Sequence, residues 1–253
     1  MRNLPIHWIL AAVAGLAIVP AVLAQNSSRP DLSGIWAREG RTAQMNFSEE
    51  APPMQAWAKT AYDENQGHAA ARGQGLDELD PTTYCLPVGM PRAMAYNYPF
   101  EIVQTPQVVY ILFESWQMQR RIYLDGREQG EAAPLRYLGF STGRYDGNAL
   151  VVETSGISDR TWLDNSGVPH SDALKVTERL RRTGPEKMEN ALRFEDPKTF
   201  TRPWESSMTY ELRPNFEILE NIGFCEDRFL YNYDQKIFRG TVGWQSPEAA
   251  AGK

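Results

Sequence analysis

The chain has 253 residues, of which 42 % are hydrophobic and 23 % are charged, values normal for a globular protein. Its formal net charge is −6. No block or helix rich in lysine and arginine is present, so we expect no nucleic-acid partner.

The first 24 residues have the pattern of a secretory signal peptide. Arg2 supplies a positive start, an apolar run extends from Trp8 to Val19, and Val22-Leu23-Ala24 places small residues where signal peptidase cuts. We predict cleavage before Gln25, a periplasmic or secreted location, and no membrane insertion after cleavage. The alternative is an uncleaved anchor helix, for which the apolar run is short.

Export changes the expectation for the two cysteines, Cys85 and Cys225. In an oxidising compartment, two cysteines are most simply explained by one disulfide. The alternative is a thiol nucleophile, which needs an activating neighbour.

The first elements of the mature chain, residues 25–253, are predicted to be a short strand at 33–36 and a helix over 48–72. Ser48 can cap this helix, and the prolines that follow it fit a first turn. Its apolar face is expected to contain Met54, Trp57, Ala58, Ala61 and Tyr62. Residues 73–99 are predicted to be an irregular cover.

From residue 100 the hydrophobic pattern changes to the period of two that is typical of strands. The predicted strands and hairpins are 100–105, 107–118, 120–128, 137–156 around Asp146-Gly147, 173–196 around Gly184-Pro185, and 206–214. Eight or nine strands joined mostly by turns predict an antiparallel meander that closes into a lipocalin- or calycin-like barrel, or forms a two-sheet sandwich. We favour the barrel, in one domain, with residues 216–253 as a packing tail.

Alternation also places polar side chains on the apolar faces of these strands. Glu178 shares a face with leucine and valine, Glu114 shares one with Tyr110 and Trp116, and Asn190 is predicted to point inward. Several inward polar groups indicate a cavity that accepts a small apolar or aromatic molecule. The alternative for Glu178 is an ion pair with Arg120 or Arg193. The residues expected to contact a ligand are Trp162, Glu114, Trp116, Tyr110 and Asn190.

Residues 160–182 contain the candidate catalytic group. A histidine with a carboxylate partner can transfer protons near neutral pH. We expect His170 to transfer the proton, Asp164 to orient it and Glu178 to be a second acid. Arg160 is the expected anchor for an anion or carbonyl. The alternative is a rigid turn, because Asn165-Ser166-Gly167 and Pro169 are turn residues.

Other classes of chemistry lack their signatures. Two mature histidines and two cysteines do not build a common zinc site, and no dinucleotide, P-loop or serine-hydrolase motif is present. We therefore expect no cofactor and no metal. An enzyme of this kind would be a cofactor-free lyase, hydratase or isomerase. The alternative is a non-catalytic periplasmic binding or envelope-interaction protein, and the sequence does not predict the oligomeric state.

Two resemblances accompany these patterns. Ser33-Gly34-Ile35-Trp36 is similar to the G-x-W of the first lipocalin strand, which implies a tryptophan that closes the barrel floor. The segments CLPVGMPRAM, PFEIVQTP, RRIYLDGRE, RTWLDNSGVPHSDALKVTERLRR and DPKTFTRPW resemble a family of uncharacterised exported bacterial proteins, over about residues 31 to 227. This second resemblance implies export and no particular chemistry.

Overall fold

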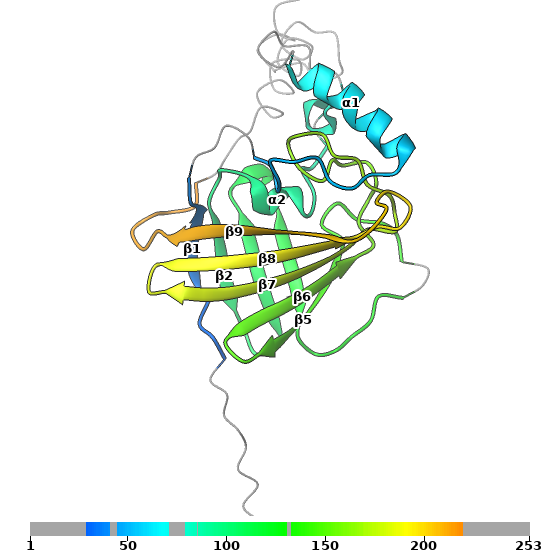
Figure 1. The fold of residues 1–253 in the computed structure, drawn as a ribbon. Helices are drawn as coiled ribbons and strands as arrows, with labels where there is room; N and C mark the ends of the chain where they lie inside the picture. Colours follow the sequence, from blue (N-terminus) through cyan, green and yellow to red (C-terminus); the bar gives the residue numbers. More distant parts are fainter. Residues whose placement is uncertain (1–28, 41–44, 71–78, 85, 131–132, 220–253) are drawn as a thin grey trace, which may run out of the picture.

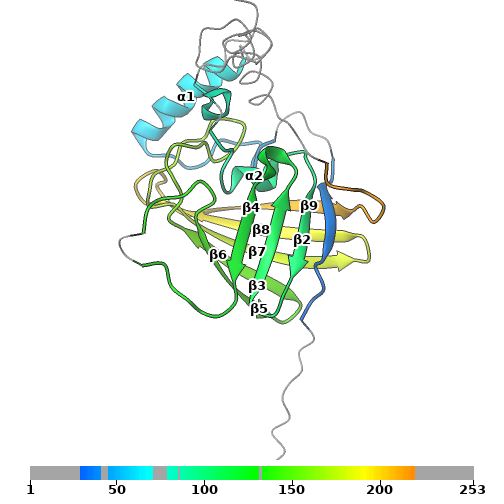
Figure 2. The same ribbon diagram turned by 180° about the vertical axis from the view of Figure 1, so that it is seen from behind.

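Nine strands close into a barrel in chain order, with β9 paired to β1. A computed structural model describes residues 29–40, 45–70, 79–84, 86–130 and 133–219. The predicted signal peptide lies outside these residues. Figures 1 and 2 show the barrel from opposite sides. The strands are β1 Gly34–Arg38, β2 Phe100–Gln104, β3 Val108–Phe113, β4 Gln119–Tyr123, β5 Phe140–Asp146, β6 Ala149–Ser155, β7 Lys175–Gly184, β8 Lys187–Glu195 and β9 Trp204–Leu212. The predicted mainly-β barrel is therefore confirmed.

The tight hairpins follow from their turn residues. Asp146 and Gly147 join β5 to β6, and Gly147 has a φ of +58°, the left-handed conformation that such a turn needs. Gly184 and Pro185 lie at the turn between β7 and β8, which pair along their whole length. Trp36, from the lipocalin-like segment, is fully buried in β1.

One strand pair departs from the predicted antiparallel meander. Strands β4 and β5 are parallel, and only two residue pairs are in register, Ile122 with Ser141 and Tyr123 with Thr142. Parallel neighbours require a long return connection, and residues 124–139 supply it. Of the neighbouring strands in the barrel, β4 and β5 therefore have the fewest paired residues.

The predicted helix over 48–72 is wrong at its start. Helix α1 spans Ala56–Ala70, because the preceding residues pair with the chain before β9: Met54 forms a bridge with Phe200, and Gln55 N donates to Thr199 O at 2.8 Å. Ser48 Oγ accepts from Glu50 N in a local turn and caps no helix. The predicted apolar face is also wrong at Trp57, which is 50 % exposed.

The predicted irregular cover over 73–99 contains two short helices, η2 Pro81–Tyr84 and α2 Arg92–Ala95. All four residues of α2 are buried. In both ribbon views α2 lies at one end of the barrel, with α1 beyond it (Figures 1 and 2). Residues 88–96 of this segment are therefore part of the core.

The predicted strand over 107–118 ends early and faces the other way. Strand β3 stops at Phe113, a 3₁₀ turn η3 occupies Ser115–Gln117, and Trp116 has a φ of 53°. The inward side chains are Val109, Ile111 and Phe113. Side chains alternate between the two faces of a strand, so an assignment that is wrong by one residue places every side chain on the opposite face. Tyr110 therefore lies on the outer face of β3 and not in the interior, as predicted.

Glu178 is inward, as predicted, and its partner is Arg120 on β4. The two side chains are 0 % and 1 % exposed and form an ion pair across the barrel interior. Asn190 Nδ2 donates to Glu178 Oε1 at 3.0 Å. Arg120 also donates to Ser141 Oγ at 3.1 Å and to Thr154 Oγ1 at 2.8 Å. The interior of the barrel thus has a polar network within an apolar core.

Removing one partner of this ion pair should destabilise the fold strongly. Glu178→Ala leaves the Arg120 charge unpaired in the interior, so the free energy of unfolding should fall by about 3–5 kcal/mol. Glu153→Ala, the matched control, removes a carboxylate from the exposed pair with Arg144 and should cost less than about 1 kcal/mol. Urea denaturation measures both. Equal losses in the two variants would contradict the structural role of Glu178.

Candidate functional site

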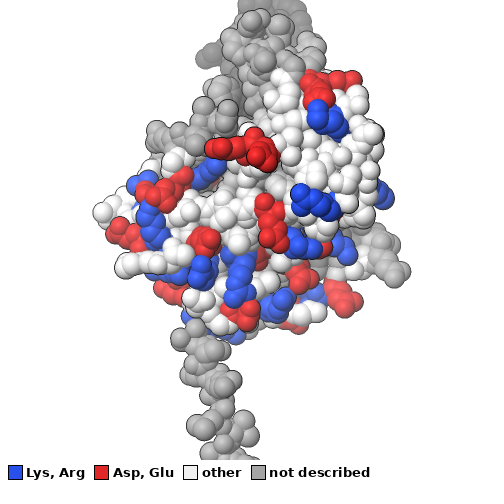
Figure 3. Space-filling view, in the orientation of Figure 1, with Lys and Arg blue, Asp and Glu red and all other residues white. Residues whose placement is uncertain are grey.

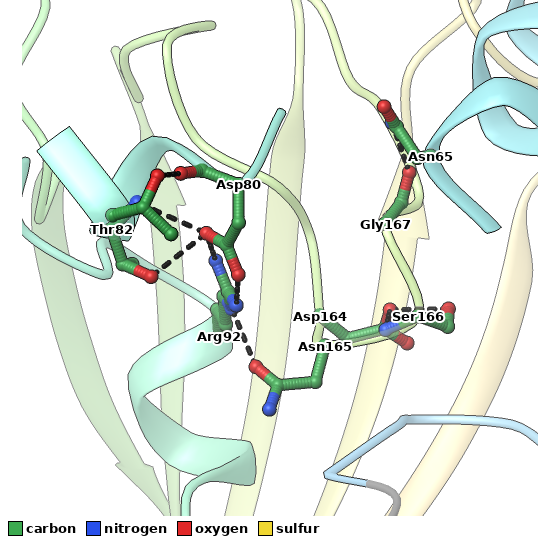
Figure 4. Close-up of polar contacts among 9 residues, drawn as sticks. Asn65, Asp80, Thr82, Arg92, Asp164, Asn165, Ser166 and Gly167 are labelled. Atoms are coloured by element: carbon green, nitrogen blue, oxygen red, sulfur yellow. Dashed lines mark hydrogen bonds and ion pairs between the residues drawn. The ribbon is translucent and has the colours of Figure 1, made fainter. Parts of the chain in front are cut away.

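The loop that holds His170 caps one end of the barrel. Residues 156–174 run between β6 and β7, and helix α1 packs on them: Asn65 Nδ2 donates to Gly167 O at 2.7 Å, and Gln66 Nε2 donates to Ser166 O. Figure 4 shows the contact of Asn65 with Gly167. Turn residues at 165–167 let the chain fold back within this loop, as the sequence predicted.

Asp164 organises the loop through its own carboxylate. Its Oδ1 accepts from Ser166 N at 2.9 Å and from Ser166 Oγ at 2.6 Å, and its Oδ2 accepts from Phe47 N at 3.0 Å. Burial raises the pKa of Asp164, while these hydrogen bonds and the charge of Arg92 oppose the shift. The carboxylate therefore joins the loop to the segment before α1.

His170 is buried and uses both ring nitrogens within the loop. Nδ1 lies 3.1 Å from Ser171 O, which can only accept, so Nδ1 is the donor. Nε2 lies 2.9 Å from Thr161 Oγ1. Burial lowers the pKa of His170, against the hydrogen bond to Ser171 O and the charges of Asp196 and Asp159. Thr161 Oγ1 also donates to Ser158 O at 3.1 Å, so Thr161 links the His170 ring to the start of the loop.

Asp164 forms no hydrogen bond with His170 in the described residues, contrary to the predicted pairing. In the part of the chain that the structure describes, the two side chains have separate partners. Arg160 is exposed at the surface of the loop. Ser171 binds Asp196 instead, through its N at 2.7 Å and its Oγ at 2.7 Å. Asp164 and Asp196 thus each hold a backbone segment through N–H groups.

A buried arginine network beside this loop was missed by the sequence analysis. Arg92 Nη1 and Nη2 donate to the two oxygens of Asp80 at 2.9 and 2.6 Å, and Arg92 Nε donates to Asn165 Oδ1 at 2.8 Å. Figure 4 shows the three side chains meeting. The Arg92 guanidinium also lies over the rings of Tyr96 and Trp162, at 5.7 and 5.4 Å from their centroids. Burial alone would raise the pKa of Asp80, but Arg92 and Thr82 hold it below its usual value.

The predicted ligand-binding residues do not form one site. Asn190 is in the barrel interior and Trp162 packs on Arg92. Glu114 follows β3, accepts from Leu219 N at 3.1 Å and lines a separate hollow with Arg38 and Tyr98. Trp116 lies edge-on to Tyr96, and Tyr110 is on the outer face of β3, paired with Arg121.

A cavity lies at the parallel seam between β4 and β5, where none of the predicted ligand contacts lies. Its volume is about 430 Å³. Its lining residues are Pro87, Met118, Gln119, Arg120, Arg121, Tyr123, Arg136, Tyr137, Leu138, Gly139, Phe140 and Ser141. The side chains of Tyr123 and Phe140 stack with centroids 5.6 Å apart. The cavity thus has aromatic and apolar walls with several cationic groups among them.

Two glycines allow the chain to close around this seam. Gly139 has a φ of +62°, and a Cβ there would lie 2.7 Å from Ser155 O. A Cβ on Gly143 would lie 2.7 Å from Ile122 Cγ2. The two glycines in the segment 137–143 were the sequence signal for a close backbone approach, although they did not reveal the parallel pairing.

The wall of the cavity shares residues with the network around Glu178 and contacts residues that pack on the capping loop. Arg120 and Ser141 belong both to its wall and to the network around Glu178. Behind its wall, Tyr137 O accepts from Met90 N at 2.8 Å, and Gly89 packs against Thr161, the partner of His170. His170 is therefore separated from the cavity by a layer of protein.

No protein-family model matches this chain, and no curated protein shows significant similarity to it. Among the described residues, no helix has the length and apolar character needed to cross a membrane. No cluster of three or more histidine, cysteine or acidic side chains suited to a metal ion occurs in the described ranges.

The lowered pKa of His170 predicts a specific dependence of stability on pH. The unfolded chain binds a proton near pH 6.5, before the folded chain does, because burial holds the folded pKa lower. Stability from the neutral ring is thus fully present above about pH 6.5 and is lost as the pH falls toward the folded pKa, by at most about 1.4 kcal/mol per pH unit.

Urea unfolding at about one pH unit above and one below 6.5 measures this loss. His170→Asn should show less of it than the wild type, because asparagine does not titrate in this range. If His170→Asn and the wild type lose the same free energy over this range, the predicted titration of His170 does not occur.

Proposed function

We propose that this protein is an exported binding barrel that holds a small molecule with an apolar or aromatic body. The observation that carries the proposal is the cavity at the β4–β5 seam. Its volume of about 430 Å³ lies within the range of small-molecule sites, which are mostly apolar with a few polar groups. Tyr123, Phe140 and Leu138 provide the apolar walls.

We infer that the protein binds its ligand without converting it, because its candidate acids and bases are engaged in the fold. His170 uses both ring nitrogens inside the capping loop, and Asp164 uses both oxygens there. Glu178 is neutralised by Arg120 in the interior. A general acid or base must be within hydrogen-bond reach of its substrate, and each of these groups is already engaged elsewhere. A cofactor-free lyase or isomerase is the alternative.

A bulky side chain at the mouth of the cavity should block binding. Gln119 is exposed on β4 and lines the cavity, and Ala191 is exposed on β8 away from it. After incubation with an extract of small apolar and aromatic metabolites, native mass spectrometry should show a retained molecule on the wild type and on Ala191→Trp. Gln119→Trp should retain at least about tenfold less, because an indole would occupy the space where the ligand lies.

Equal retention by Gln119→Trp and Ala191→Trp would place the ligand elsewhere and reject the cavity as the site. The free pool is analysed by chromatography in the same experiment. If a pool member is converted to a product by the wild type and not by His170→Ala, the protein is an enzyme and the alternative replaces the proposal.

Export and a disulfide complete the proposal, and both rest on the sequence. The leader pattern of residues 1–24 supports the first, and the two cysteines support the second; both segments lie outside the described residues. The intact mass of protein made with its leader should equal that of residues 25–253 and should be two hydrogens lighter than the reduced form. A full-length mass would contradict cleavage, and an unchanged mass on reduction would contradict the Cys85–Cys225 disulfide.

A further inference from the structure

The cavity at the β4–β5 seam carries an unbalanced positive charge. Among the residues that the structure describes, three arginines line it, Arg120, Arg121 and Arg136, and no aspartate or glutamate does. The chain as a whole has a formal net charge of −6, so this local excess of cations runs against the balance of the molecule. A hollow lined by one sign of charge attracts a small molecule of the opposite sign.

Four arginines on the outer face of strands β5, β7 and β8 have carboxylate partners, whereas Arg38 and Arg182 donate to backbone carbonyls. Ion pairs of 2.6 to 3.0 Å join Arg144 to Glu153, Arg179 to Asp146, Arg181 to Glu189 and Arg193 to Glu195. Figure 3 shows the result on the face of β7 to β9, where blue and red side chains alternate.

Two of the cavity arginines depart from this pattern. In the described part of the chain, Arg121 makes only a 3.4 Å hydrogen bond to Gln119, and the Arg136 side chain has neither a hydrogen bond nor an ion pair. Their charges are therefore available to a ligand.

Arg120 is the third arginine of the cavity lining, and its side chain is buried in the wall. Its Nε and Nη2 are engaged by Ser141, Thr154 and Glu178, but its Nη1 is buried with no hydrogen-bond partner. A buried donor that lacks a partner is costly, and such groups are rare in folded proteins. Because solvent does not reach this nitrogen, Arg120 shapes the wall of the cavity and is not counted among the groups that bind a ligand. Glu178 offsets the charge of Arg120, so the unbalanced charge comes from Arg121 and Arg136.

We propose that the ligand of this cavity is an aromatic or apolar carboxylate, whose ring or chain lies among Tyr123, Leu138 and Phe140 and whose carboxylate is bound by the two exposed arginines of the lining. The inference rests on the proposed function and names its ligand class. A guanidinium presents two parallel donors that match the two oxygens of a carboxylate. Arg121 and Arg136, the two exposed arginines of the lining, attract and hold the charge.

Calorimetric titration with 2-naphthoate and its neutral isostere 2-naphthamide tests the inference. The carboxylate should bind the full mature chain at least about tenfold more tightly than the amide, since hydrogen bonds to charged groups are the stronger ones. Arg121→Gln and Arg136→Gln should each weaken 2-naphthoate binding by about five- to twentyfold, and their effect on 2-naphthamide should stay within about twofold. Arg144→Gln, the matched control, makes the same charge change on β5 at an arginine that pairs with Glu153 and should leave both affinities unchanged.

The possible results separate this inference from the proposed function. If both probes bind equally, Gln119→Trp weakens both and the arginine variants weaken neither, the cavity binds small molecules but does not select an anion, and the inference is overturned. If neither probe binds, the molecule retained from the metabolite extract decides: an acid lost in Arg121→Gln supports the inference, and a neutral molecule overturns it. If the extract yields no retained molecule either, the proposed function fails and this inference fails with it.

Discussion

The ion pair between Arg120 and Glu178 is the constraint around which the barrel interior is arranged. Neither charge has access to solvent, and the cost of burying each one is met only by the other and by the hydrogen bonds around them. Ser141, Thr154 and Asn190 provide those bonds from three further strands. The network therefore fixes which faces of β4 to β8 point inward, and it brings Arg120 to the seam where the cavity lies.

A second buried network stiffens one end of the barrel in the same way. Arg92 joins Asp80 to Asn165, and Asp164 joins the loop to the segment before α1. His170 likewise has both ring nitrogens engaged within the loop. The buried charges of the interior and the capping loop thus have partners, whereas Arg121 and Arg136 at the side of the barrel have no carboxylate partner in the described residues. That distribution separates the groups that hold the fold from those that are available to a ligand.

What the sequence predicted correctly was local. The turns at Asp146-Gly147 and Gly184-Pro185 were identified because their residues determine their own backbone conformation. Glu178 and Asn190 were placed inward because regular alternation holds through β7 and β8, and Arg120 was one of two partners considered for Glu178.

What the sequence did not predict depends on distant contacts or on a break in the pattern. The faces of β3 were reversed because the strand stops at Phe113 and the chain turns at Trp116. The start of α1 was set by the bridge from Met54 to Phe200, far along the chain. Nothing in the sequence around Arg92 predicts that it is buried, because its partners Asp80 and Asn165 are brought to it by the fold. The cavity was missed because nothing local distinguishes a parallel seam from one more hairpin.

The return segment between β4 and β5 has a consequence for how this fold can diversify. Four of the residues that line the cavity, Arg136 to Gly139, lie on this segment and not on a barrel strand. A hairpin turn cannot change its length without disturbing the register of two strands, but a long crossover connection is free of that restriction. Insertions or exchanges within it would alter the charge and shape of the cavity while the other strand pairs stay as they are. The barrel strands would then stay the same among related proteins, and the binding preference would depend on the sequence of this one connecting segment.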